Sequence, residues 1–295
     1  MMDEIPTLAV IGGSGLYEMP GLEHAEMLDL NTPFGKPSAP IVLGALEGRR
    51  VAFLARHGTG HHISPSEINF RANIFALKSL GVERIVSISA CGSLREDFRP
   101  GDIVIPNQLF DFTRDRKRTF FEGGLVAHIS VANPFCQHLS GEVFRAVKDT
   151  GAKVHKGGDF ITIEGPRFST RAESNTYRAW GMHLIGMTTS PEAFLAREAE
   201  ICYAVMALVT DYDVWHASEE PVTVEMVIEI LMRNTDLARR AIRNLVEHLA
   251  PERPCDCGRA LAGALITRPE VIPPETRLRL GLLIDKYLVS EEDQD

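Results

Sequence analysis

The sequence lacks a long hydrophobic run and lacks an excess of basic residues. Along its 295 residues, no apolar stretch approaches the roughly 18 residues of a membrane-spanning helix. The first residues, MMDEIPTLAV, lack the basic start and long apolar core of a signal peptide. Lys and Arg (31) are outnumbered by Asp and Glu (40), and the formal net charge of −9 argues against a polyanionic partner. We expect a cytoplasmic protein that binds neither membrane nor nucleic acid and holds only small anions.

Cysteine is also scarce, with five residues in the chain. They are too few and too scattered for a disulfide framework, so we expect reduced thiols. Cys255 and Cys257 are separated by one residue instead of two, and no second ligand pair follows in the sequence. This spacing is not typical of a structural zinc site, and we expect no metal.

Composition and periodicity predict the fold class. With 44% hydrophobic and 24% charged residues, the chain can bury one large core. Short apolar runs alternate with helical periodicity, which predicts a three-layer α/β fold around a mostly parallel, twisted central sheet. The expected strands are residues 7–11, 41–46, 51–54, 82–89, 103–105, 158–163, 184–187 and 203–210, and the expected helices are 68–80, 136–150, 171–180, 193–199 and 222–249.

Local signals refine this prediction. Strand, helix and strand over residues 51–89 imply a parallel pair of strands joined by a crossover. Ser64 or Ser66 is expected to cap the first helix, and Thr189 or Ser190 the helix at 193–199. The charged residues 111–119 read as a solvated loop. We expect a domain over residues 1–250 and an extension over 251–295, with one helix at 275–288 and the acidic tail SEEDQD.

Polar residues follow the strands where ligands bind in open α/β sheets. Arg56 and His57 come directly after residues 51–54, and a cationic pair at this edge favours a small anion such as phosphate. The alternative is a loop arginine beside a structural histidine. Ser89 and Ala90 end the next strand and offer a hydroxyl and a backbone N–H, and Thr188 adds another hydroxyl.

The glycine-rich segment IGGSGL is a further candidate anion cradle, in which Ser14 offers a hydroxyl donor. No Gly-Lys-Ser/Thr follows and the dinucleotide pattern is incomplete, so binding of NTP or NAD is disfavoured.

The other candidates suit a purine base. Phe168 can stack on a flat ring, although filling of the core is an open alternative. Asp211 and Asp213 follow the strand at 203–210, and their carboxylates suit a base with an exocyclic amino group. The alternative is a pair of solvated acids.

Taken in order, six motifs resemble one family. The motifs IGGSGL, TPFGKPS, ACGSLREDFRPGDIVIP, TIEGPRFSTRAES, GMTTSPEA and TDYD lie between Ile11 and about Ala250. Together they resemble the nucleoside phosphorylases of the 5′-methylthioadenosine phosphorylase group. The resemblance implies that phosphate cleaves a 5′-methylthio nucleoside to adenine and a ribose 1-phosphate analogue, in a homotrimer without metal or organic cofactor.

The resemblance also implies roles for single residues. Ser14, Arg56, His57, Ser89, Ala90 and Thr188 are expected to hold phosphate, and Phe168, Met187, Asp211, Asp213 and His128 the nucleoside. Asp211 is the candidate acid at N7 and Asp213 the partner of the amino group. His128 is expected near the sugar of a neighbouring subunit's site, and Ser169 and Val224 are expected to be specificity positions.

Several alternatives stay open at this point. One is a purine nucleoside or methylthioinosine phosphorylase, and another is a catalytically silent nucleoside-binding protein or scaffold. The acidic pair and the retained anion-site residues argue against both. The 5′ group of the substrate (methylthio, deoxy or hydroxyl) is not determined. Cys255-Asp256-Cys257 resembles a Cys-X-Cys element of some thermophile relatives, in which cysteine pairing adds stability. A Cys136–Cys202 bridge is a second hypothesis, because both cysteines lie in the family core.

Overall fold

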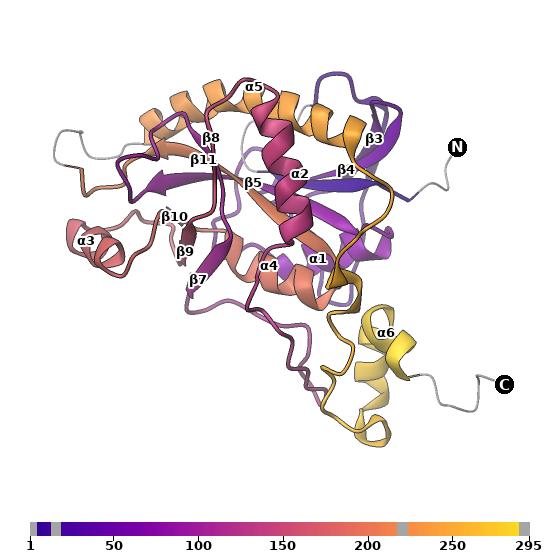
Figure 1. Cartoon of the computed structure of the whole chain (residues 1–295). Helices are drawn as coiled ribbons and strands as arrows, with labels where there is room; N and C mark the ends of the chain where they lie inside the picture. Colours follow the sequence, from indigo (N-terminus) through magenta and orange to yellow (C-terminus); the bar gives the residue numbers. More distant parts are fainter. Residues whose placement is uncertain (1–4, 13–18, 217–223, 289–295) are drawn as a thin grey trace.

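One mixed β-sheet organises the protein (Figure 1). The structure, a computed structural model, describes residues 5–12, 19–216 and 224–288. The strands are β1 (Leu8–Gly12), β2 (Glu23–Leu28), β3 (Ile41–Leu46), β4 (Arg49–Ala55), β5 (Arg84–Ser93), β6 (Ile103–Ile105), β7 (Gln108–Phe112), β8 (Val154–Lys156), β9 (Asp159–Ile163), β10 (Leu184–Gly186) and β11 (Cys202–Asp211). The helices are α1 (Phe70–Ser79), α2 (Gln137–Lys148), α3 (Arg171–Ala179), α4 (Thr189–Glu198), α5 (Val224–His248) and α6 (Pro274–Leu288), with short 3-10 helices η1 (Asp256–Arg259) and η2 (Pro269–Val271).

The long strands β5 and β11 form the centre of the sheet. They run parallel to each other, and β1 and then β4 continue the parallel order on the other side of β5. Strand β10 pairs antiparallel with the last residues of β5, beyond the point where β1 ends. The mostly parallel sheet is therefore confirmed. Residues 51–54 and 82–89 lie in parallel strands as expected, but β4 and β5 are not hydrogen-bonded to each other, because β1 lies between them.

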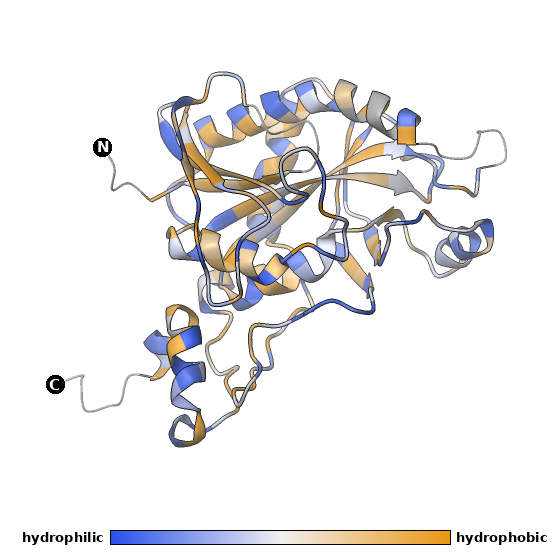
Figure 2. Ribbon diagram, turned by 180° about the vertical axis from the view of Figure 1, so that it is seen from behind, coloured by the Kyte–Doolittle hydropathy of each residue, from blue (hydrophilic) through white to orange (hydrophobic). Residues whose placement is uncertain are grey.

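Helices cover both faces of the sheet, which confirms the three-layer prediction. In β1, Ala9 and Ile11 join the core beneath α1 and α4, whereas Leu8 and Val10 join the core beneath α2 and α5. This alternation follows from the two-residue period of a strand, and a strand buried on both faces reads as a continuous apolar run. Figure 2 shows the central strands as hydrophobic, with the more hydrophilic residues on the covering helices.

Both predictions of helix caps are wrong. Asn69 caps α1, and its side chain accepts a hydrogen bond from the N–H of Ala72. Ser64 instead donates its hydroxyl to Glu67 at 2.6 Å, so the polar connector folds into its own turn before the helix begins. Helix α4 has no side-chain cap: Thr188 takes the cap position without a capping bond. Ser190 has an extended backbone conformation (φ −104°, ψ 137°) at a kink in α4, but its hydroxyl makes no capping bond.

The charged segment 111–119 is not a solvated loop throughout, because Arg116 is buried. Its guanidinium donates to the carbonyls of Met187 and Ser190, each at 2.7 Å. It also donates to the carbonyl of Glu164 at 2.7 Å and forms an ion pair with its carboxylate. Arg116 thus ties together the loops that follow β9 and β10.

The segment after α5 packs back against the rest of the chain. Arg84, at the start of β5, donates to the carbonyls of Ala250, Pro251 and Glu252. Leu280 and Ile284 of α6 are buried in the same core cluster as residues of α1 and α4, and Figure 1 shows α6 at one end of the molecule. The predicted acidic tail lies outside the described residues.

None of the helices in the described ranges combines the length and the apolarity needed to cross a membrane.

Candidate active site

A cavity of about 550 Å³ opens where several strands of the sheet end. Arg56 and His57 reach it after β4, Met187 and Thr188 after β10, and Asp213 after β11. The middle of β5 contributes its floor, and α5 closes one side. The lining includes Ser89, Ala90, Cys91, Gly92, Phe168, Ser169, Ile185, Thr210, Asp211, Val224, Met232 and Thr235.

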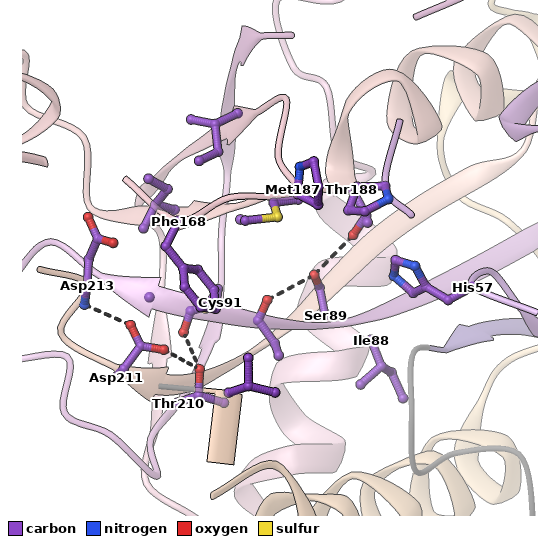
Figure 3. Close-up of a pocket in the computed structure, with 18 of the residues that line it drawn as sticks. His57, Ile88, Ser89, Cys91, Phe168, Met187, Thr188, Thr210, Asp211 and Asp213 are labelled. Atoms are coloured by element: carbon purple, nitrogen blue, oxygen red, sulfur yellow. Dashed lines mark hydrogen bonds between the residues drawn. The ribbon is translucent and has the colours of Figure 1, made fainter. Parts of the chain in front are cut away.

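Most candidates from the sequence therefore meet in one place (Figure 3). His128 is an exception, since it is exposed, does not line this cavity, and donates its backbone N–H to the carbonyl of Ala264 at 2.9 Å. Ser14 lies outside the described residues. Arg56 and Asp211 lie at the carboxyl ends of β4 and β11, as the rule for ligand sites in open α/β folds predicts. Ser89 and Ala90 do not end their strand as expected, because β5 continues to Ser93.

Arg56 is buried and its charge is compensated. Its side chain is 1% exposed, and Nη1 lies 3.0 Å from Oε1 of Glu192, whose side chain is 0% exposed. The guanidinium also donates to the hydroxyl of Ser87 at 2.9 Å and to the carbonyls of Ile11 and Ile88. Glu192 accepts further hydrogen bonds from Ser87 and from the hydroxyl of Tyr203, each at 2.7 Å. These contacts fix the guanidinium at the cavity wall.

His57 does not add a positive charge next to Arg56. Its Nδ1 lies 2.9 Å from the carbonyl oxygen of Ile63. Since a carbonyl only accepts, Nδ1 carries the proton and Nε2 of the neutral ring is an acceptor. Burial, followed by the charge of Arg56, lowers the pKa of His57 to about 4. The prediction of a cationic pair is therefore wrong. The charge of Arg56 is paired with Glu192, and His57 is neutral at neutral pH.

Hydroxyl groups line the same end of the cavity. The hydroxyls of Ser89 and Thr188 lie 3.3 Å apart, and both side chains are buried. Thr188 also lies 3.4 Å from Nη1 of Arg56. Figure 3 shows Ser89 and Thr188 facing each other across the gap between β5 and the end of β10. The arrangement offers neutral donors and one compensated guanidinium to a small anion.

The opposite end of the cavity carries the acidic pair. Asp211 accepts hydrogen bonds from the hydroxyl of Thr210 at 2.6 Å and from the backbone N–H of Asp213 at 2.8 Å. Asp213 has a φ of 52°, a left-handed conformation that Asp tolerates better than most residues. Figure 3 shows the two carboxylates pointing apart. The alternative of two solvated acids is wrong, since burial raises the pKa of both carboxyl groups.

Two hydroxyl groups support the Asp213 carboxylate. Burial raises the pKa of Asp213, and hydrogen bonding from Ser174 and Ser169 opposes that rise. Oδ2 of Asp213 and both hydroxyl oxygens are buried. The three side chains therefore form one polar group in the wall of the site.

Phe168 lies over the middle of the cavity. Its side chain is 40% exposed, so the alternative in which it fills the core is wrong. Figure 3 shows its ring between Met187 and the acidic end. An open aromatic face beside a thioether is well suited to a flat base and the face of a sugar.

The sequence did not single out several residues that shape this site. Glu192 was read only as part of a helix start, although it neutralises Arg56. Gly92 leaves room for the acidic pair, because a Cβ there would lie 2.9 Å from Oδ1 of Asp211 and 3.0 Å from Cγ2 of Ile185. Its place in ACGS, at the end of a strand, was the available signal for such a close approach.

The fold and this site agree with the comparisons with known proteins. Residues 7–249 match the model of a family described as the phosphorylase superfamily, so the chain belongs to this family. Within it, the chain is 53% identical over 282 residues to the S-methyl-5′-thioadenosine phosphorylase of Geobacter sulfurreducens, covering 95% of this chain and 99% of that one.

Solved structures of similar proteins agree with this family assignment. A methylthioadenosine phosphorylase sourced from an antarctic soil metagenomic library superposes with a TM-score of 0.90 at 47% identity, covering 95% of this chain and 100% of that chain. The methylthioadenosine phosphorylase of Schistosoma mansoni in complex with adenine gives a TM-score of 0.82 at 37% identity, over 88% of this chain and 96% of that chain. The family resemblance predicted from the six motifs is confirmed.

Proposed function

We propose that this protein catalyses the phosphorolysis of S-methyl-5′-thioadenosine to adenine and 5-methylthioribose 1-phosphate, a reaction of purine and methionine salvage. The observation that carries the proposal is the division of one cavity into a hydroxyl-lined end at Arg56 and an acidic end at Asp211 and Asp213. Relatives that are about half identical over nearly the whole chain are named for this activity.

Phosphate belongs at the end formed by Arg56, His57, Ser89, Ala90 and Thr188, with Ser14 as a further ligand. The pair of hydroxyls at 3.3 Å offers donors to two phosphate oxygens. His57 with a protonated Nδ1 presents Nε2 as an acceptor, which suits a phosphate oxygen that still carries a proton. Because Glu192 cancels the charge of Arg56, recognition depends on geometry more than on net charge.

The base belongs at the acidic end. Asp213 supplies a carboxylate oxygen for the 6-amino group of adenine, and Ser169 lies beside it as a specificity residue. Asp211 faces N7 and gives it a proton, which its raised pKa favours. A 6-oxo base would present a lone pair to Asp213 in place of a donor, so the purine nucleoside and methylthioinosine alternatives fit less well.

The sugar and its 5′ group lie between these ends. Phe168 stacks on the base and Met187 packs against the ribose. Val224 and Met232 of α5 line the cavity with apolar surface. Apolar walls favour a methylthio or methyl group over a hydroxyl, since an unpaired hydroxyl would lose its hydration there.

The chemistry follows from these positions. A phosphate oxygen forms a bond to C1′ while the bond from C1′ to N9 breaks, and the electron pair goes to the purine. Positive charge grows on the ribose above the phosphate, and the proton from Asp211 neutralises the leaving base at N7. No step requires a metal or an organic cofactor.

The same proposal includes a homotrimer in the cytoplasm. His128 is exposed on its own chain, and Val126 and Val131, two residues before it and three after it, are exposed as well, which fits a face that borders a neighbouring subunit's site. Light scattering coupled to gel filtration tests the oligomeric state, with a mass of about three chains expected.

The activity test compares S-methyl-5′-thioadenosine, 5′-deoxyadenosine and adenosine. We expect phosphate-dependent release of adenine from all three, with kcat/KM decreasing in that order. Adenine release that does not depend on phosphate would indicate a hydrolase and overturn the proposal.

A further inference from the structure

Four of the five cysteines meet in one cluster outside the active site. Cys136, Cys202, Cys255 and Cys257 place their Sγ atoms within 4.8 Å of one another. Cys136 is the cap residue of α2, Cys202 is the first residue of β11, and Cys255 and Cys257 flank the start of η1. Segments far apart in the sequence thus converge on one point.

The distances fit a shared site better than pairs of bonded sulfurs. The Sγ atoms of Cys202 and Cys255 lie 3.4 Å apart, and all the cysteines are free. A disulfide bond measures about 2.0 Å. Four sulfurs at about 2.3 Å from a central zinc ion would lie about 3.8 Å from one another. Neither hypothetical bridge, Cys255–Cys257 or Cys136–Cys202, is formed in the structure.

The prediction of no metal depended on a missing second pair of ligands. That premise is wrong, because the fold brings Cys136 and Cys202 to the Cys255–Cys257 pair. Residue spacing along the chain cannot reveal ligands that come from a helix cap and a strand start.

The surroundings of the sulfurs suit thiolates. Cys136, Cys202 and Cys257 are buried in the core between the sheet, α2 and α5. The backbone N–H of Leu139 points at Sγ of Cys136 at 3.5 Å, and Nη1 of Arg197 at Sγ of Cys257 at 3.4 Å. N–H donors to sulfur stabilise metal-bound thiolates, and the guanidinium offsets part of their negative charge.

We infer that Cys136, Cys202, Cys255 and Cys257 form a structural site for one Zn²⁺ ion. Four soft sulfur ligands in a closed, tetrahedral set are typical of structural zinc. Binding releases one proton from each thiol and forms four Zn–S bonds, so no oxidant or reductant is needed. The ion would tie the segment after α5 to α2 and β11. It is not part of catalysis, because Cys202 and Asp211 lie at opposite ends of β11.

The first test is metal analysis of the full-length protein. After expression with added zinc, we expect one zinc per chain. The double variant Cys255→Ser/Cys257→Ser should retain less than about a tenth of that amount, because two of the four ligands are lost. Asp256→Asn is the matched control: its exposed side chain lies between the two ligands, and it should keep the full amount.

The second test does not depend on the folding of a variant. The parent protein is stripped with a chelator under reducing conditions and titrated with Zn²⁺ or Co²⁺. We expect uptake of one ion, the charge-transfer absorption of a tetrathiolate Co²⁺ site, and a rise in Tm on reloading. Absence of uptake by the folded, reduced protein would overturn the site, as would iron at the same stoichiometry. A mass of the unreduced, alkylated protein that shows disulfides in place of five alkylated thiols would also overturn it.

Discussion

Arg56 and Glu192 form an ion pair from which water is almost excluded, with an N–O distance of 3.0 Å and exposed fractions of 1% and 0%. The pair connects the loop after β4 to the helix after β10, two segments that border the same cavity. It therefore fixes the wall of the proposed phosphate site and also contributes to stability.

We expect Arg56→Lys to weaken both phosphate binding and the stability of the fold. Lysine keeps the charge but cannot reproduce the forked set of donors that reaches Glu192, Ser87 and two carbonyls. The phosphate KM should rise, or turnover should fall, by about tenfold or more, which corresponds to about 1.4 kcal/mol. Steady-state kinetics with varied phosphate measures this effect.

Lys36→Ala serves as the control, since its pair with Asp29 has side chains 62% and 65% exposed. Removal of this pair should cost less than about 1 kcal/mol of unfolding free energy and leave the kinetics unchanged. An Arg56→Lys variant with the parent's phosphate dependence would remove Arg56 from the phosphate site.

The lowered pKa of His57 predicts a stability change with pH. The folded state keeps the ring neutral down to a pKa of about 4, whereas the unfolded state takes up a proton near the ordinary 6.5. The unfolded state therefore binds more protons in this window, and the unfolding free energy falls as the pH decreases from about 6.5 to 4. The contribution of His57 is at most about 3.4 kcal/mol.

His57→Asn isolates this contribution, because its amide can still donate to the carbonyl of Ile63 but does not titrate. Urea unfolding at several pH values should give a smaller acid-side loss for the variant than for the parent. In the difference between the two curves, the contributions of other titrating groups cancel. One such group is Glu198, whose pKa burial raises to about 7. Parallel curves over this window would show that His57 is not held neutral.

Gly92 should be required for the geometry of the acidic pair. In Gly92→Ala, the new Cβ would meet Oδ1 of Asp211 at 2.9 Å and Cγ2 of Ile185 at 3.0 Å. We expect a loss of kcat of about a hundredfold, because a small misplacement of a catalytic group is costly. Gly141→Ala in α2 is the control: nothing lies within 4 Å of its Cβ, and it should stabilise the helix by up to about 1 kcal/mol. Full activity of Gly92→Ala would show that catalysis does not depend on the position of the Asp211 carboxylate.

The sequence was sufficient to place the edge of the sheet that carries the site. Arg56 and Asp211 each follow an apolar run, and the parallel strands β4 and β11 bring their carboxyl ends to one edge. Thr188 also follows an apolar run, but it reaches the site because β10 runs antiparallel to the end of β5. Periodicity and length also predicted the helices at α2, α3, α5 and α6 to within a few residues.

The partners of these residues were not predictable. Glu192 lies 136 positions from Arg56, and no local pattern links the two. The cysteine cluster and the buried Arg116 were missed for the same reason: each depends on donors or ligands that only the folded chain brings together. The predictions of the helix caps were wrong for a local reason: several polar residues near the helix start could each have been the cap.

Selection of the base is the central claim, and Asp213 is the residue that tests it. Its carboxylate lines the cavity and suits the amino group of adenine, whereas a 6-oxo group would face it with another acceptor. Such a mismatch costs several kcal/mol and thus orders of magnitude in kcat/KM. Asp213→Asn replaces one acceptor by a donor and should shift the preference towards 6-oxo substrates.

The most direct measurement is therefore the ratio of kcat/KM for methylthioadenosine to that for methylthioinosine, in the parent protein and in Asp213→Asn. We predict a ratio of at least about a hundred in the parent and a decrease of about tenfold or more in the variant. A parent protein that cleaves both nucleosides equally well, or a ratio that the substitution leaves unchanged, would contradict the reading of the base by Asp213.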